Sequence, residues 1–137
     1  MVSISKIKGD IMAEIADYQI ITKGPFTLTE SNPKKDLPFD LPVSISTSAG
    51  GVLGFVVADV SGGLFGAATS VEFEILANNI SLTKYTLKTG TICSLLETFS
   101  GGGSLKIGAN TTTFKVTKSN LAGVKISDVV LWFQRNV

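Results

Sequence analysis

Histidine is absent from this chain of 137 residues, and cysteine occurs only once, as Cys93. Histidine is the side chain used most often as a general base near neutral pH and as a metal ligand, so catalytic triads and zinc sites are disfavoured. A single cysteine cannot form an internal disulfide, and without a neighbouring base we expect Cys93 to be a buried structural thiol. The sequence therefore predicts no catalytic residues, no metal ligands and no cofactor, and a protein that is not an enzyme.

Charge is also scarce, at 17% of residues with a net charge of +1, while the mean hydropathy is +0.35. The longest basic run is Lys34-Lys35, which cannot hold a polyanion, so nucleic-acid binding is excluded. Much of the apolar content must be buried in a core, in an interface with a protein, or against a membrane. A surface with little charge also favours association between copies, so homo-oligomerisation is a further hypothesis.

Glycine, by contrast, is plentiful, and pairs of glycines stand ahead of stretches in which apolar and polar residues alternate. Gly62-Gly63 precedes residues 71–75, Gly102-Gly103 precedes residues 113–116, and Gly50-Gly51 is a weaker echo. Glycine supplies positive φ at turns, and alternation places apolar side chains on one face of a strand. Strands are predicted at about residues 43–47, 52–57, 69–76, 81–87, 91–96, 104–107, 112–117 and 124–133. This pattern predicts an all-β fold, with residues 1–137 forming one antiparallel β-barrel or closed sandwich of about eight strands.

Two segments at the ends of the chain have specific predictions. Residues 10–18 fit either one face of a helix or a strand, and we favour the strand, followed by a turn at Lys23-Gly24-Pro25 that joins it to residues 26–29. Residues 129–133 are apolar at every position, which is typical of a strand packed centrally or closing the sheet against the N-terminal strand.

Residues 30–42 hold three of the four prolines and are predicted to form a loop, because proline removes backbone donors. Asp36 and Asp40 begin two similar tripeptides on either side of Phe39. The pair could bind calcium or dock a partner. We favour a stiff connector anchored by Phe39, since calcium needs more oxygen ligands.

Residues 48–68 contain a single charge, Asp59, so their length would allow a membrane-crossing element. We favour two core strands joined by a tight turn at residues 59–63. Membrane insertion of this hairpin, as in a pore-forming protein, is the alternative.

Polar residues suggest two kinds of site. Glu72 and Glu74 share one face of a strand, where they would form either a hydrolase acid–base pair or, as we favour, a wet surface paired with Lys84, Lys88 or Lys115.

Sugar binding would use amides in loops. The candidates are Asn78, Asn79, Asn110 and Asn120, and residues 79–81 and 110–112 also match the glycosylation acceptor pattern. Exposed aromatic rings are expected to be few, because Trp132 and the phenylalanines lie in apolar runs and are predicted to pack in the core.

Between about residues 8 and 112 the chain carries a series of short glycine-containing and apolar motifs. In chain order these are Gly9-Asp10-Ile11-Met12, Tyr18-Gln19, Gly24-Pro25, Gly51-Val52-Leu53-Gly54 before Asp59, Ser70-Val71-Glu72-Phe73, and Ser100-Gly101-Gly102-Gly103-Ser104-Leu105 before Gly108-Ala109. The series resembles the virulence-associated protein family of Rhodococcus, called Vap. The resemblance implies a secreted, eight-stranded antiparallel barrel of two Greek-key-like halves, without an established catalytic site, that acts on host endolysosomal compartments.

The leading hypothesis is therefore a non-enzymatic β-barrel interaction protein that binds a host protein or a membrane surface. Secretion is expected from the resemblance, although residues 1–6 show no secretory signal. A carbohydrate-binding, lectin-like module and a membrane-inserting, pore-forming protein are the two alternatives.

Overall fold

Nine β-strands make up the regular structure of the part of the chain that is described, namely residues 14–46, 50–62, 69–99, 105–119 and 122–136 of a computed structural model. In chain order the strands are β1 (Glu14–Thr22), β2 (Phe26–Leu28), β3 (Lys34–Leu41), β4 (Gly51–Gly62), β5 (Ser70–Ala77), β6 (Ile80–Lys88), β7 (Cys93–Phe99), β8 (Gly108–Ser119) and β9 (Ala122–Asn136). The all-β prediction is confirmed.

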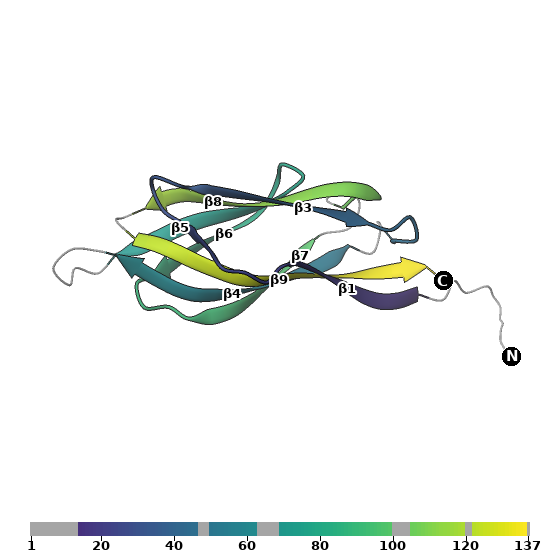
Figure 1. Ribbon diagram of the computed structural model, residues 1–137, viewed down its shortest axis with the longest axis horizontal. Coiled ribbons are helices and arrows are strands. Elements are labelled where there is room, and N and C mark those ends of the chain that lie inside the picture. Colours follow the sequence, from purple (N-terminus) through teal and green to yellow (C-terminus); the bar gives the residue numbers. More distant parts are fainter. Residues whose placement is uncertain (1–13, 47–49, 63–68, 100–104, 120–121, 137) are drawn as a thin grey trace, which may run out of the picture.

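The strands form two antiparallel sheets that pack face to face (Figure 1). Sheet A has the order β1-β9-β4-β7, with β2 beside β9, and sheet B has the order β3-β8-β5-β6. Leaving out the short β2, this interleaved order is that of an eight-stranded jelly roll. The described strands therefore form the sandwich rather than the closed barrel, because each sheet ends in edge strands, β1 and β7 in one and β3 and β6 in the other.

Alternation explains how the sheets acquire one apolar face each. In β5 every second residue is buried, and Phe73 is fully enclosed between the sheets together with Phe114 of β8. Phe55 of β4 meets both rings edge to face, with ring centroids 6.3 Å from Phe73 and 5.2 Å from Phe114. This aromatic cluster joins sheet A to sheet B, and edge-to-face pairs of this kind stabilise a core beyond their buried area.

One polar contact links the two sheets where β6 and β7 face each other. Tyr85 of β6 donates its hydroxyl to the Glu97 carboxylate of β7 at 2.8 Å, while its ring packs 5.6 Å from that of Phe73. Burial, with the hydrogen bond and charge of Glu97, raises the pKa of Tyr85 to about 12.

The last strand lies in the middle of sheet A, as its apolar sequence predicted. One edge of β9 pairs with β1 and then β2, and the other pairs with β4. The turn at Lys23-Gly24-Pro25 therefore joins two strands, as expected, but these strands follow one another along β9 instead of pairing together. The described part of residues 10–18 belongs to β1, which confirms the strand over the helix from Glu14 onward.

Two short strands that were predicted are not formed. Residues 43–46 contribute only an isolated bridge between Ile45 and Arg135, and residues 105–107 precede β8, which begins at Gly108. Gly50 has a positive φ directly before β4, so the predicted link between a glycine pair and the start of a strand holds there. Gly63 and the pair Gly102-Gly103 lie outside the described residues.

The prediction of a loop over residues 30–42 is wrong, because Lys34–Leu41 form β3. Pro38 is accommodated because β3 is an edge strand, which pairs only with β8 among the described strands and so does not need a second set of backbone donors. Leu37, Phe39 and Leu41 alternate into the core, so the expected anchoring by Phe39 is confirmed.

The predicted hairpin within residues 48–68 is also wrong over its described part. Gly51–Gly62 form the single strand β4, which continues through Asp59 after a register shift and pairs Asp59 with Lys125 of β9. Pairing with β9 continues the strand past the polar residues that suggested a turn, as far as Gly62, whereas pairing with β7 ends at Val57. Among the described residues, none lies in a helix long and apolar enough to cross a membrane.

Candidate functional site

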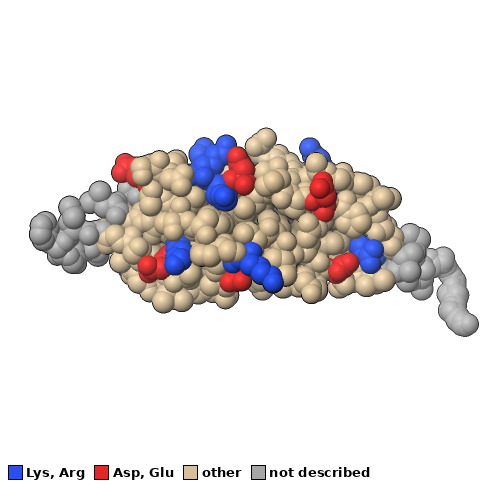
Figure 2. All heavy atoms as spheres, viewed as in Figure 1, with Lys and Arg blue, Asp and Glu red and all other residues tan. Residues whose placement is uncertain are grey.

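The outer face of sheet B is polar and charged, as Glu72 and Glu74 predicted. Glu74 lies between Lys84 and Lys115 on the neighbouring strands and accepts a hydrogen bond from Ser81 at 2.5 Å. Glu72 accepts one from Thr117 at 2.7 Å, and this bond, helped by nearby lysines, lowers the pKa of Glu72. The two carboxylates therefore form the expected wet surface, and Figure 2 shows charges of both signs interspersed on the side in view.

Three of the four candidate asparagines come together at one end of sheet B. Asn78 and Asn79 have φ of 49° and 67° and form the tight turn between β5 and β6, where such dihedrals favour asparagine. Asn78 donates its amide to Asn110 at 2.9 Å and accepts from the backbone of Thr111. A shallow polar pocket of about 350 Å³ lies beside the turn. Asn120 lies outside the described residues.

Asn110 has a structural role. It is 3% exposed, and its side chain bonds the Lys106 N–H, the Lys106 carbonyl and the Gly108 carbonyl at 2.8–3.0 Å. These bonds use the groups that a sugar would need. Burial also closes residues 110–112 as a glycosylation acceptor, whereas Asn79 is exposed at its turn.

The two other sites considered from the sequence are not assembled. Asp36 of β3 accepts a hydrogen bond from Thr113 and lies 3.6 Å from Lys34, and no group of three or more potential metal-binding side chains occurs among the described residues. Cys93 is partly buried and packs against the core, in agreement with a structural thiol.

The outer face of sheet A is different, because exposed apolar and aromatic side chains gather on it. Pairing places Tyr18 of β1 beside Trp132 of β9, and Trp132 beside Val52 of β4. The next row across the same sheet contains Ile20, Val130, Gly54 and Leu96. The exposed fractions are 60% for Tyr18, 42% for Trp132, 44% for Ile20 and 67% for Leu96. We call these residues, with Val52, Val130 and Gly54, the aromatic platform.

Gly54 gives the Trp132 ring its position. A Cβ atom at Gly54 would lie 2.6 Å from Cζ3 and 3.1 Å from Cη2 of Trp132, so the far edge of the ring rests over the glycine backbone. Leu96 approaches the same point from β7, with Cδ2 3.0 Å away. The missing side chain at Gly54 thus allows the indole of β9 to reach across β4 toward β7, which broadens the exposed apolar surface.

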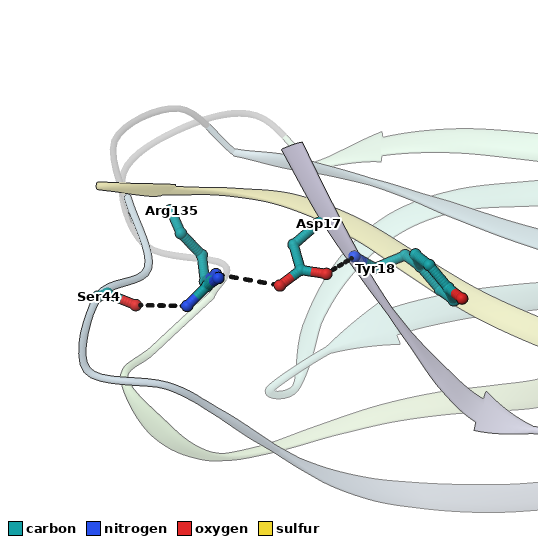
Figure 3. A network of polar contacts seen from close by, with 4 residues as sticks. All are labelled: Asp17, Tyr18, Ser44 and Arg135. Atoms are coloured by element: carbon teal, nitrogen blue, oxygen red, sulfur yellow. Dashed lines mark hydrogen bonds and ion pairs between the residues drawn. The ribbon is translucent and has the colours of Figure 1, made fainter. Parts of the chain in front are cut away.

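Tyr18 is held at the other side of the platform by a polar network (Figure 3). Asp17 accepts a hydrogen bond from the Tyr18 backbone N–H at 2.8 Å, and its other oxygen lies 3.0 Å from Nε of Arg135. Arg135 also donates to the Ser44 hydroxyl at 3.4 Å. Alternation along β1 turns the Asp17 side chain away from the face on which Tyr18 stands. The network therefore fixes the backbone of Tyr18 without placing a charge on the platform.

A shallow cavity of about 340 Å³ adjoins the platform. Trp132, Val52 and Gly51 line it together with Ala16, Thr98 and Gln134. The hydroxyl and amide groups of Thr98 and Gln134 thus lie at the margin of an apolar surface. An arrangement of aromatic rings with a few polar groups beside them can bind a ligand that is apolar on its faces and polar at its edges.

The prediction that Trp132 packs in the core is wrong, whereas it is confirmed for Phe55, Phe73 and Phe114. Residues 129–133 are apolar at every position, so the sequence does not say which alternate residues face the second sheet. The sequence also gives no local signal that Tyr18 is exposed on this face. The signal that could have identified the pair is the pairing of β1 with β9, which is a long-range contact.

No known protein family matches the sequence, and no curated protein matches it. The resemblance to the Vap family therefore remains a prediction.

Similarity to solved structures is found at the level of the fold. The chain aligns with latent PorU from Porphyromonas gingivalis with a TM-score of 0.60 and 12% identity, over 91% of this chain and 13% of that one. It aligns with the Stig cyclase Fisc from Fischerella sp. TAU with a TM-score of 0.50 and 11% identity, over 97% and 81% of the two chains. A CBM36 domain of a xylanase from the hindgut metagenome of Trinervitermes trinervoides gives 0.49 and 8%, over 88% and 96%. At such low identity the first two matches show a shared fold and nothing about ligands.

Proposed function

We propose that this protein is a carbohydrate-binding module without catalytic activity, and that it holds its ligand on the aromatic platform of sheet A. The observation that carries the proposal is the exposed, adjacent pair Tyr18 and Trp132 on a face that sheet B does not cover. A lectin-like module was an alternative from the sequence. The platform now supports it better than the asparagine turn does.

The physical reason lies in the two-sided character of sugars. A pyranose ring has hydroxyl groups around its rim and C–H groups on its faces, so it stacks on an aromatic ring while its rim remains hydrated. Covering the indole and phenol rings removes apolar surface from water, and this drives the association. Thr98 and Gln134, which line the cavity beside Trp132, are placed to hydrogen-bond the rim and orient the sugar.

The size of the effect follows from exposure. Trp132 is 42% exposed, which for a side chain of about 250 Å² leaves about 100 Å² for a ligand to cover. At about 25 cal/mol per Å², covering that area contributes at most about 2.5 kcal/mol. The substitution Trp132→Ala should therefore weaken binding by up to about 70-fold.

A glycan array, followed by calorimetric titration of the best ligand, tests the proposal. Wild-type protein should bind at least one glycan, and Trp132→Ala and Tyr18→Ala should each weaken that binding. Ile80→Ala is the matched control, because Ile80 is 48% exposed but belongs to sheet B. Failure of the wild type to bind any glycan, or equal losses in Ile80→Ala and Trp132→Ala, would contradict the proposal.

The same platform supports a second candidate, a protein partner, which was the leading hypothesis from the sequence. Leu96 is 67% exposed and Ile92, just before β7, is 73% exposed, so apolar surface extends to the edge of sheet A. Exposed aliphatic side chains of this kind are typical of protein interfaces. Loss of a partner on Leu96→Ser, with glycan binding unchanged, would favour this candidate.

A further inference from the structure

We infer that the ligand of the aromatic platform is an uncharged glycan whose rings carry equatorial hydroxyl groups, such as a β-1,4-linked glucan or xylan. This inference rests on the proposed carbohydrate-binding function and adds the chemical class of the sugar. It is carried by the distribution of charge over the two outer faces of the sandwich.

The platform contains no charged side chain among the described residues. Across its two rows, each paired neighbour is aromatic, aliphatic, glycine or a hydroxyl residue. The adjoining cavity is lined by uncharged residues only. A carboxylate or sulfate bound here would lose water without gaining a cationic partner, which is unfavourable.

The charged residues closest to the platform in sequence point elsewhere. Asp17 and Arg135 pair with each other at 3.0 Å, and Figure 3 shows Tyr18 directed away from this pair. The charged residues that lie nearer along the strands are acidic: Asp128, two residues from Val130 in β9, is exposed, and Glu14 begins β1 four residues before Tyr18. Asp59 and Lys125 lie farther away, as neighbours on β4 and β9. Lys125 is seven positions along β9 from Trp132, and seven residues of strand span about 23 Å. Lys125 therefore does not reach a sugar stacked on Trp132, and Arg135 is paired with Asp17.

The shape of the aromatic platform also restricts the stereochemistry of the sugar ring that it can bind. The indole edge rests over Gly54, so the ring of Trp132 extends along the sheet from β9 over β4. A broad, low surface of this kind contacts the whole face of a sugar ring. When all hydroxyl groups are equatorial, both faces of the ring are C–H surfaces, whereas an axial hydroxyl places a polar group on one face. Stacking that polar group on indole would cost its hydration without a compensating hydrogen bond.

Three hexasaccharides separate these features. Cellohexaose is neutral and equatorial, its C6-carboxylate counterpart adds charge alone, and β-1,4-mannohexaose adds an axial O2 alone. Xylohexaose serves as a second neutral, equatorial ligand. Titration of the full chain with each should give binding of cellohexaose or xylohexaose at least about tenfold tighter than of the other two, a difference of about 1.4 kcal/mol. Binding should be unchanged between about 50 mM and about 500 mM sodium chloride, because no ion pair contributes.

The outcomes distinguish the inference from the function it rests on. Tighter binding of the carboxylated or the mannose oligosaccharide, lost in Trp132→Ala, would overturn the inference and leave carbohydrate binding in place. A strong dependence of glycan binding on salt concentration would also overturn the inference and leave carbohydrate binding in place. The absence of binding to all four oligosaccharides and to a glycan array would overturn both.

Discussion

The substitution Gly54→Ala tests whether ligand binding depends on the Trp132 ring resting across β4. The new methyl group would lie 2.6 Å from Cζ3 of Trp132 and 3.0 Å from Cδ2 of Leu96. Carbon atoms in contact prefer about 3.5–4.0 Å, so the indole edge must move by about 1 Å. The ring is the free end of a side chain and moves more easily than the backbone. Gly54→Ala should therefore tilt Trp132 away from β4.

The effects of Gly54→Ala on glycan affinity and on the free energy of unfolding can both be estimated. Fixing a side chain that has become mobile costs about 0.5–1.5 kcal/mol on binding, so glycan affinity should fall by about 2- to 12-fold. Gly54 does not have a positive φ, so alanine fits its backbone, and the lost flexibility of the unfolded chain offsets part of the steric cost. The free energy of unfolding should change by less than about 1 kcal/mol.

The assay uses the single tryptophan of the chain, whose emission reports on the platform alone. Emission of Gly54→Ala should shift toward that of exposed indole, and a fluorescence titration should give the weaker affinity. Gly24→Ala is the matched control, since a Cβ there meets nothing within 4 Å. Unchanged emission together with unchanged affinity in Gly54→Ala would refute the described position of the ring and its role.

Substitutions at three further positions test other parts of the structure. Burial and Glu97 raise the pKa of Tyr85 from the ordinary 10 to about 12, so its stabilising contribution is complete below pH 10 and is lost as the pH rises through 12. Urea unfolding of Tyr85→Phe should therefore show less alkaline destabilisation than that of the wild type. Asn110→Ala removes bonds to three backbone groups and should lower the free energy of unfolding by about 2–4 kcal/mol, while glycan affinity stays within error of wild type. Asp17→Ala should weaken glycan binding by about 2- to 10-fold in titrations, because it loosens Tyr18. Asp17→Asn keeps an acceptor for the Tyr18 N–H and should retain most of the wild-type affinity. If Asp17→Asn binds as weakly as Asp17→Ala, Asp17 does not position Tyr18.

Local pattern was sufficient to predict the strands that are buried on one face. In β5 and β8 alternation identified Phe73 and Phe114, which are fully buried, and Glu72 and Glu74, which are on the wet face. The local pattern failed to predict β3. Proline argues against a strand that pairs along both edges, but it is tolerated in an edge strand, and Pro38 lies in one. Whether a strand lies at an edge is decided by partners far away in the chain.

The platform could not be predicted for the same reason. An apolar run such as residues 129–133 gives no alternation, so it does not reveal that Trp132 faces outward. The role of Gly54 is equally invisible, since glycine within a strand is ordinarily a weakness. Only the pairing of β9 with β1 and β4 brings Tyr18, Trp132 and Gly54 together.

The most direct test of the account is a map of backbone amide chemical shifts on titration with a neutral equatorial oligosaccharide. The largest changes should fall on β1, β9, β4 and β7 around Tyr18, Trp132, Gly54 and Thr98, together with the indole N–H of Trp132. Changes centred instead on the turn at Asn78 and Asn79, or on the charged face of sheet B, would contradict binding on the aromatic platform.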